Sequence, residues 1–344
     1  MRDNQKPVVG ICLAKIQDAT RSDLMQRICR EARDRGFRVQ IYNMYTDLFF
    51  HRKRDEGEKS ILNVLQMELL SVLIVLPQTV LDERTVRELI DRAKQAKVPV
   101  ISIDQQIPGC YNVLYEYEKP FAQVVRHVFQ VHHCRRVAFV AGFKGNPFSE
   151  ARIQVYKDAL EEFGIPFDPT LLKYGDFWDW PAYAAAKELL EQGLPEAIIC
   201  ANDTMAVSVI GALNARGIRV PGDIMVSGFD NTYNARNYAP EISSVARPLG
   251  QCGALACQLL YNAWHGVPQT RVHKLEMQPR FTESCGCGAH YCDTIRDFKK
   301  HNYQIQEDFN VDISLLSRMA CSLVECANYE EYIEALKEFV LETN

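Results

Sequence analysis

The sequence predicts an α/β protein of two Rossmann-like lobes, with parallel sheets joined by three crossovers, plus a C-terminal helical extension. Three observations support this fold class. Short apolar runs alternate with helical patterns along most of the chain, which is typical of repeated βα units. The alternation occurs in two series, one on each side of residues 112–118. Beyond about Asp293, Pro and Gly are absent and apolar residues recur at spacings of three and four.

The first series of units runs from residue 8 to residue 104. Its expected elements, in chain order, are a strand at Val8–Leu13, a helix at Ser22–Arg35, a strand at Arg38–Tyr42, a helix at Ile61–Leu70, a strand at Ser71–Leu76, a helix at Val86–Ala96 and a strand at Val98–Ile103. The spacing of Leu24, Ile28 and Ala32 predicts the first helix, and Gly36 ends it. This order of elements predicts a parallel sheet with helices on both faces.

The second series repeats the same alternation. Its expected elements are a helix at Phe121–Val131, a strand at Arg136–Ala141, a helix at Arg152–Phe163, a strand at Leu171–Tyr174, a helix at Ala182–Gln192, a strand at Ala197–Ala201, a helix at Thr204–Arg216 and a strand from Ile224 to Gly228. We therefore expect one two-lobed domain over residues 7–288. Its N-lobe would take residues 7–114 and 247–280, its C-lobe residues 115–246 and 281–288, with crossovers near Val113–Glu116, Val245–Pro248 and Arg280–Thr282.

The helical extension, residues 293–344, carries an apolar stripe at heptad-like spacing. The stripe comprises Ile295, Phe298, Ile305, Phe309, Ile313, Leu316, Ala320, Leu323 and Ala327. Such a helix either packs on its own lobe or forms the seam of a dimer, and the pattern leaves both open. A second amphipathic helix begins at Tyr329.

Composition narrows the class of protein. The formal net charge of the 344 residues is −5, without the basic bias that nucleic-acid binding requires. The longest apolar run, around Leu69–Leu76, is too short for a membrane helix, and the N-terminus shows no secretory signal. The twelve cysteines have no disulfide-framework spacing, so we expect free thiols and a cytoplasmic location.

Two strands of the second series end in polar residues, which makes these residues candidates for ligand contact. Asn202 and Asp203 follow one strand, and Asp230 follows the next. In an open parallel sheet, ligands bind beyond the carboxyl ends of the strands. Asp203 is also well placed to cap the helix that begins at Thr204, and Asn202 could be a turn residue.

These motifs resemble the lactose- and purine-repressor family. The family pattern is Asn-Asp and a small-residue helix, then Gly-x-x-x-Pro-x-Asp, then a strand ending in Gly-Phe/Tyr-Asp, which here are Asn202-Asp203, Gly217–Asp223 and Gly228-Phe229-Asp230. Further matches are Pro240, Arg247-Pro248, Pro279–Ser284 and Arg152, which opens a helix. The resemblance covers about residues 7–288 and implies an effector-binding core with the fold of periplasmic sugar-binding proteins.

The resemblance implies a sugar, polyol or nucleoside ligand in the cleft between the lobes. It assigns ligand contacts to Asp230, Asn202, Arg152 and Phe177. To these we add Trp178 as a stacking candidate. Four weaker candidates lie in the N-lobe: Asp18 and Gln17 in its first loop, and Gln78 and Asp104 at the ends of later strands. The competing interpretations are that Arg152 pairs with Glu150 or Asp158 at the surface and that Trp178 is packing. No cofactor is expected.

The expected function follows from two departures from the family. The first strand begins at Val8, which leaves no room for a DNA-reading headpiece, and ordinary repressors lack the helical tail. We therefore expect a cytosolic small-molecule sensor module of a bacterial signalling or regulatory protein. Its lobe closure would pass through the tail of a homodimer to an output domain such as a GGDEF diguanylate cyclase. The alternatives are a repressor-type effector-binding domain and a transport-type solute-binding protein. We expect no direct contact with nucleic acid or membrane.

Neither an enzyme site nor a familiar metal site emerges from the sequence. No Gly-x-Ser-x-Gly elbow and no phosphate loop occur, so we expect no catalytic activity. Cys285, Cys287, His290 and Cys292 lie in one short Gly-rich stretch, but their spacing is not a common zinc pattern. Reduced thiols in a connector are the favoured interpretation, with a zinc site as the alternative. His132 and His133 end a helix, where the helix dipole accounts for them.

Overall fold

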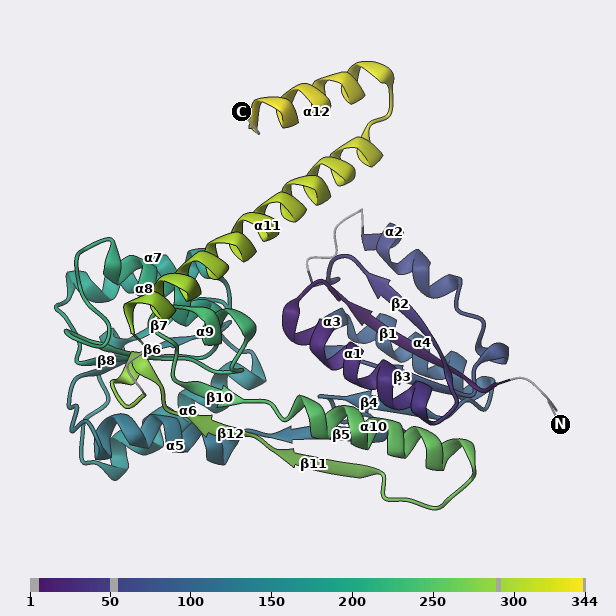
Figure 1. Cartoon of the computed structure of the whole chain (residues 1–344), viewed down its shortest axis with the longest axis horizontal. Helices are drawn as coiled ribbons and strands as arrows, with labels where there is room; N and C mark the ends of the chain where they lie inside the picture. The colour runs from purple at the N-terminus through teal and green to yellow at the C-terminus, as the bar shows by residue number, and fades with distance from the viewer. Residues whose placement is uncertain (1–5, 50–54, 289–291, 343–344) are drawn as a thin grey trace.

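The computed structural model describes residues 6–49, 55–288 and 292–342. Two α/β lobes lie side by side, and a long helix leaves one of them (Figure 1). The N-terminal series forms one lobe and the second series the other. This arrangement confirms the fold class that the alternating pattern predicts.

The N-lobe is built on a six-stranded sheet in the order β11-β5-β4-β3-β1-β2. The strands are β1 (Val8–Ala14), β2 (Arg38–Met44), β3 (Val72–Val75), β4 (Val100–Ile103), β5 (Tyr111–Glu116) and β11 (Val272–Glu276). All neighbours pair in parallel. The strands β1, β3 and β4 are mostly apolar and fully buried, as parallel central strands usually are. The one polar side chain among them, Ser102 of β4, donates to the carbonyl of Gln105.

The C-lobe is built on a four-stranded parallel sheet in the order β7-β6-β8-β9. The strands are β6 (Val137–Ala141), β7 (Leu172–Tyr174), β8 (Ala197–Cys200) and β9 (Met225–Ser227). A separate pair, β10 (Ser244–Ala246) and β12 (Gln278–Arg280), runs antiparallel between the lobes. These two strands and β5 carry the chain across, as Figure 1 shows.

Helices cover both faces of each sheet. In the N-lobe they are α1 (Ala19–Asp34), α2 (Asp55–Ser60), α3 (Pro77–Val80), α4 (Glu83–Gln95) and α10 (Leu249–Trp264); in the C-lobe α5 (Glu118–Gln130), α6 (Pro147–Glu162), α7 (Asp179–Glu191), α8 (Asp203–Asn214) and α9 (Tyr233–Asn237). Short 3₁₀ turns lie at Ile61–Asn63, Met67–Leu69, Pro169–Leu171 and Glu283–Cys285. Within the described ranges, we find no helix with the length and apolar character of a membrane span.

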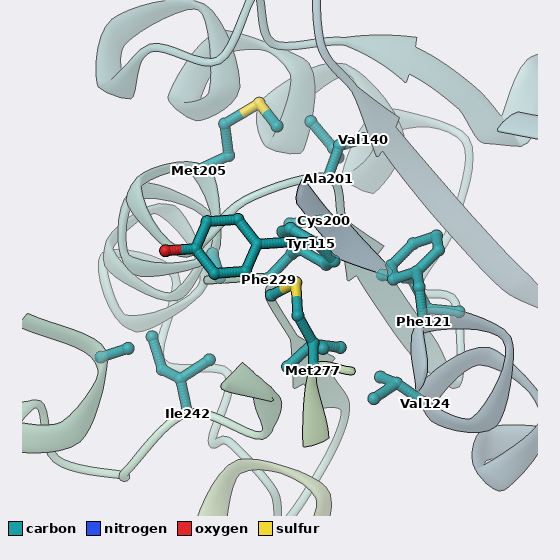
Figure 2. Close-up of a cluster of buried hydrophobic side chains, with 14 of the residues drawn as sticks. Tyr115, Phe121, Val124, Val140, Cys200, Ala201, Met205, Phe229, Ile242 and Met277 are labelled. Atoms are coloured by element: carbon teal, nitrogen blue, oxygen red, sulfur yellow. The ribbon is translucent and has the colours of Figure 1, made fainter. Parts of the chain in front are cut away.

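The apolar core continues from one lobe into the other through the crossing segments. Tyr115 of β5 and Met277, just before β12, belong to the same buried cluster as Phe121 and Phe229 of the C-lobe (Figure 2). The rings of Phe121 and Phe229 meet edge to face, with 5.7 Å between centroids. The hinge region is therefore a packed part of the core.

The tail forms α11 (Asp293–Glu325) and α12 (Tyr329–Glu342). The first turns of α11 pack on the C-lobe through a polar face. Arg296 pairs with Glu283, Lys299 pairs with Glu241, and the ring of Tyr303 meets Tyr238. The apolar stripe lies on another face. Its members Ile295, Phe298, Ile305, Phe309 and Leu316 are 43–64% exposed. The stripe therefore does not pack on the chain's own lobe at these positions.

Two expectations about elements need correction. Residues 61–70 form two 3₁₀ turns around Val64, and the helix predicted there is wrong; the preceding residues Asp55–Ser60 form α2 instead. The apolar spacing at this place fills the core with Leu62, Leu65 and Met67 from a loop. The helix α10 was not among the expected elements, although its buried residues recur at helical spacing: Cys252, Gly253, Ala256, Cys257, Leu259 and Leu260, most of them small.

Candidate functional site

Strained backbone marks the carboxyl ends of the strands. Five of the non-glycine residues with positive φ follow strands directly or within three residues: Lys15 (56°), Asp104 (68°), Asp176 (51°), Phe177 (58°) and Asp230 (102°). Such conformations cost free energy and concentrate at functional sites. Both lobes contribute to this set, as expected for a site in the cleft between them.

Arg247 joins the two lobes. It follows β10, and its Nη1 donates to Oδ2 of Asp104 over 2.6 Å. Its Nη2 lies 2.8 Å from Oδ1 of Asp230, which also accepts from Nε at 2.9 Å. Asp104 ends β4 in the N-lobe, whereas Asp230 follows β9 in the C-lobe. One guanidinium therefore connects a carboxylate of each lobe, and its five fixed donors suit this role.

Arg152 lies buried in an aromatic surrounding. Its guanidinium carbon lies 3.9 Å from the ring centroid of Phe229, 5.5 Å from Tyr117 and 5.8 Å from Phe177. Nη1 donates to the carbonyl of Ala201 over 2.9 Å, while Nε is buried without a hydrogen-bond partner. Neither surface carboxylate considered from the sequence pairs with this arginine in the structure. Burial lowers the pKa of Arg152.

Asp230 acts on the electrostatics of Arg152. The charge of Asp230 raises the pKa of the buried guanidinium, against the effect of burial and of the charge on Arg247. The two residues thus lie within electrostatic reach of each other in the C-lobe. Asp230 itself is half-buried and engaged by Arg247.

Phe177 and Trp178 lie in the loop between β7 and α7. A Cβ atom at Gly142 would lie 2.1 Å from the Phe177 ring, so only glycine leaves room for the ring there. Trp178 is 38% exposed, and Nζ of Lys15 from the N-lobe lies 5.2 Å from its ring centroid. Trp178 therefore faces the opposite lobe, which is where a stacking residue must lie to meet a ligand in the cleft.

Asn202, and not Asp203, caps the helix α8. Asn202 is the N-cap of α8: its Oδ1 accepts from the amide of Met205, and its Nδ2 donates to the carbonyl of Phe177. The expectation that Asp203 caps this helix is wrong. Asp203 is 1% exposed and accepts from Ser244 Oγ and from the amide of Thr232.

Asp18 is exposed and caps α1 by accepting from the amide of Arg21. Its charge raises the pKa of Arg21, which burial lowers; Asp47 and Asp230 raise it as well. Asp18 thus lies near the cleft acids while its side chain holds a helix terminus. The cap accounts for an aspartate at this position without a ligand.

Sequence reasoning did not assign a ligand-site role to Arg247, Tyr117 or Lys15. The signal for Arg247 was present, since it lies in a family motif and in a predicted crossover, where a long cation can reach both lobes. Tyr117 and Lys15 carry no such signal, because their place depends on how the two lobes face each other. A second group of polar side chains, His127, His132, Cys285 and Cys287, gathers at the far end of α5. Of the Gly-rich stretch that suggested a zinc site, His290 lies outside the described residues.

The site offers a defined chemistry to a ligand. Arg152 supplies charged donors, Asp230 and Asp104 supply acceptors, and three aromatic rings line the arginine. Donors and acceptors beside flat apolar faces suit hydroxyl-bearing or heterocyclic molecules. No nucleophile with an adjacent base occurs among the residues named in this site.

Comparison with known proteins supports the fold. Residues 126–284 match the family model described as "Periplasmic binding protein-like domain". Catabolite control protein A of Priestia megaterium is 34% identical over 180 residues, which are 50% of this chain and 53% of that protein. The chain thus spans about half the length of this relative in the match.

Two solved structures show the same fold across both lobes. The regulator CelR in complex with cellobiose has a TM-score of 0.66 at 22% identity, covering 83% of this chain and 86% of the other. The lac repressor dimer, bound to operator and an anti-inducer, has a TM-score of 0.65 at 20% identity, covering 82% and 95%. Residues 126–284 of the chain are therefore similar to a periplasmic binding protein-like domain, and the two lobes share the fold of these solved regulators.

Proposed function

We propose that this chain is the effector-binding module of a transcription regulator, and that it binds a carbohydrate or nucleoside in the cleft between its lobes. Ligand contacts would come from Arg152, Asp230, Phe177 and Trp178, with Asp104 from the N-lobe. Asn202 would shape the site by holding α8 and the carbonyl of Phe177. The known relatives are regulators, which supports a binding function over an enzymatic one.

The buried guanidinium of Arg152 is the observation that carries this proposal. Leaving a charged donor unpaired in the interior is costly unless a partner arrives. Its Nε has no partner, and three rings enclose the group. A ligand hydroxyl or ring nitrogen would satisfy the donor. The half-buried rings of Phe177 and Tyr117 would meet the flat face of a sugar or base, whereas Phe229 is buried against the arginine.

The arrangement also supports a mechanism for switching. Arg247 holds carboxylates of both lobes, so any ligand that competes for Asp104 or Asp230 changes the connection between the lobes. A ligand shifts the balance of open and closed states only by its differential affinity for them. Asp104 belongs to one lobe and Asp230 to the other. A ligand that binds either carboxylate in place of Arg247 would therefore have different affinities for the open and the closed state.

The relatives favour a repressor-type effector domain over a sensor that drives a diguanylate cyclase. Both the sequence relative and the solved structures are transcription regulators. We therefore place the output of this module in transcription, although the sequence alone gave preference to another signalling output. The cytoplasm remains the compartment that we propose for it, since the free thiols suit reducing conditions.

A calorimetric titration tests the ligand proposal. Mono- and disaccharides, polyols, nucleosides and nucleobases are first screened by thermal shift on the intact chain, and the best compound is then titrated. We expect saturable binding of one compound class, and we expect Arg152→Lys to weaken it by about tenfold or more, since a lost charged hydrogen bond costs about 1.5–3 kcal/mol. Lysine keeps the charge but loses the planar donors.

Arg126→Lys is the matched control. Arg126 is an exposed arginine on α5 that pairs with Glu162 on the surface of the same lobe. The substitution Arg126→Lys should leave the affinity for the compound unchanged. Absence of any binding compound, with normal unfolding of both variants, would contradict the proposal, as would equal effects of the two substitutions.

A further inference from the structure

Two histidines and two cysteines lie close together in the C-lobe: His127, His132, Cys285 and Cys287. None of them belongs to the candidate ligand site described above. The Nε2 atoms of His127 and His132 lie 3.1 Å apart. Sγ of Cys287 lies 3.3 Å from each of them, and Sγ of Cys285 lies 3.7 Å from Nε2 of His127. All four atoms fall within 4.8 Å of one another.

We propose that these four side chains bind one Zn²⁺ ion in tetrahedral geometry. With Zn–N near 2.0–2.1 Å and Zn–S near 2.3 Å, a regular tetrahedron requires about 3.3 Å between two nitrogens and about 3.6 Å between nitrogen and sulfur. The four distances given above differ from those values by no more than about 0.3 Å. The widest pair of ligand atoms, at up to 4.8 Å, would move closer on binding the ion. Two thiolates and two imidazoles form a common ligand set of structural zinc sites.

Direct hydrogen bonding accounts poorly for this arrangement. Two neutral imidazoles can share only one proton between facing Nε2 atoms, and thiols are weak donors and acceptors. A single cation at the centre satisfies the lone pairs of all four groups. On binding, the two thiols each release a proton, so the charges of the ion and of the two thiolates cancel within the site.

The local structure holds the four groups in place. His127 lies in the last turn of α5, and Phe281 stacks on its ring with centroids 3.9 Å apart. His132 follows two residues after the end of the helix. Both histidines therefore come from one helix terminus, which fixes their separation through the backbone.

Glycines shape the segment that carries the cysteines. Gly286 lies between Cys285 and Cys287 at a φ of +83°, a left-handed conformation that glycine adopts without strain. A Cβ at Gly288 would lie 2.6 Å from the backbone carbonyl carbon of Thr282. The chain thus turns tightly back on itself, and this turn brings both sulfurs to the same side, against α5.

The metal would fasten the base of the tail to the C-lobe. The cysteines lie 158 residues or more from His127 in sequence and a few residues before α11. Closing so long a loop by a metal restricts the unfolded chain strongly. The ion would therefore fix the point where α11 leaves the lobe, independently of whether the cleft holds a ligand.

The test measures metal in the intact chain, purified without chelator and with any affinity tag removed. We expect one zinc per chain by mass spectrometry of the metal content. Replacing zinc by Co²⁺ should give the intense visible bands of tetrahedral cobalt and the near-ultraviolet band of a cobalt–thiolate bond. Removing the metal with a strong chelator should lower the unfolding temperature, and added Zn²⁺ should restore it.

Two matched pairs of variants assign the ligands. Cys287→Ser and His132→Asn should lose zinc and the cobalt bands, whereas Cys292→Ser and His133→Asn should keep both. All four positions are exposed or half-buried, and His133 has a φ of +57° that asparagine tolerates, so each variant is expected to fold. Circular dichroism checks this.

Three outcomes would overturn the proposal. One is wild-type protein with neither zinc nor a cobalt–thiolate band after reduction. Another is loss of zinc from Cys292→Ser, because a different ligand set would then hold the ion. The third is a disulfide between Cys285 and Cys287 in protein purified under reducing conditions, detected by the mass of thiol-alkylated peptides.

Discussion

At the scale of single residues, burial determines which partners a carboxylate has. Asp203 and Asp230 both follow strands of the C-lobe sheet, and the sequence treats them alike. In the structure Asp203 is enclosed beneath Gly228, whose added Cβ would lie 2.4 Å from its Oδ1. Asp230 instead reaches the cleft and pairs with Arg247. Strand ends could thus be predicted from the sequence, whereas the direction of each side chain depends on packing that the sequence does not display.

The enclosed carboxyl of Asp203 predicts a pH dependence of stability. Burial, and next the charge of Asp230, raise the pKa of Asp203 from 3.8 to about 7, against bonds from Ser244 and Thr232 that lower it. The folded chain then holds a proton that the unfolded chain releases above about pH 4. The stabilisation is complete below that pH and is lost as pH rises toward 7, at up to about 1.4 kcal/mol per pH unit.

Urea unfolding of Asp203→Asn at pH 5, 6 and 7 checks this expectation. Asparagine can accept from the Thr232 amide and donate to Ser244, so the variant should fold and its stability should fall less over this range. Asp223→Asn is the control, because pairing with Arg219 holds the pKa of Asp223 at about 2, below the range tested. Parallel pH profiles for wild type and Asp203→Asn would refute the assignment.

At the scale of elements, periodicity predicts the regular units well and fails where packing is irregular. The unbroken apolar runs became buried strands because both faces of each sheet are covered. Residues 61–70 have helical spacing, but they bury Leu62, Leu65 and Met67 from two 3₁₀ turns and the segment between them. Periodicity reports which residues are buried, and several backbone shapes can bury the same residues.

The helix α11 has a polar face that contacts the C-lobe and an exposed apolar stripe, and the stripe predicts a homodimer. Its polar face packs on the C-lobe, while its stripe from Ile295 to Leu316 is exposed at the described positions named above. Stripes at spacings of three and four form two-stranded coiled coils by pairing with a copy of themselves. We expect Ile305→Glu combined with Phe309→Glu to convert a dimer to a monomer in light scattering.

Lys300→Glu provides the control for this expectation. Lys300 is exposed and lies on the side of α11 opposite to the stripe, so the change in charge there should leave the dimer intact. Monomeric wild-type protein would exclude α11 as a dimer seam. A dimer that survives both glutamates would place the contact between the lobes instead.

At the scale of the whole molecule, two kinds of contact connect the lobes. One is the ion pairing of Arg247 with Asp104 and Asp230, and the other is the apolar core that continues through the crossing segments. The alternation of strands and helices in the sequence predicts the two Rossmann-like sheets, and the resemblance to the repressor family predicts a ligand cleft between them. The contacts across the cleft could not be predicted in this way. Arg247, the pair of Lys15 with Trp178, and the stacked rings of Phe49 and Phe143 all depend on the angle between lobes, which no local pattern encodes.

Arg247 should therefore control how far the lobes open. In Arg247→Gln the connection between Asp104 and Asp230 is lost, and breaking such charged hydrogen bonds costs about 1.5–3 kcal/mol. The closed population should fall by about tenfold or more, which small-angle X-ray scattering would detect as a larger radius of gyration without ligand. Arg126→Gln removes a charge from a surface pair within the C-lobe and should leave the scattering unchanged. An unchanged radius in both variants would mean that the apolar hinge, rather than this ion pair, fixes the lobes.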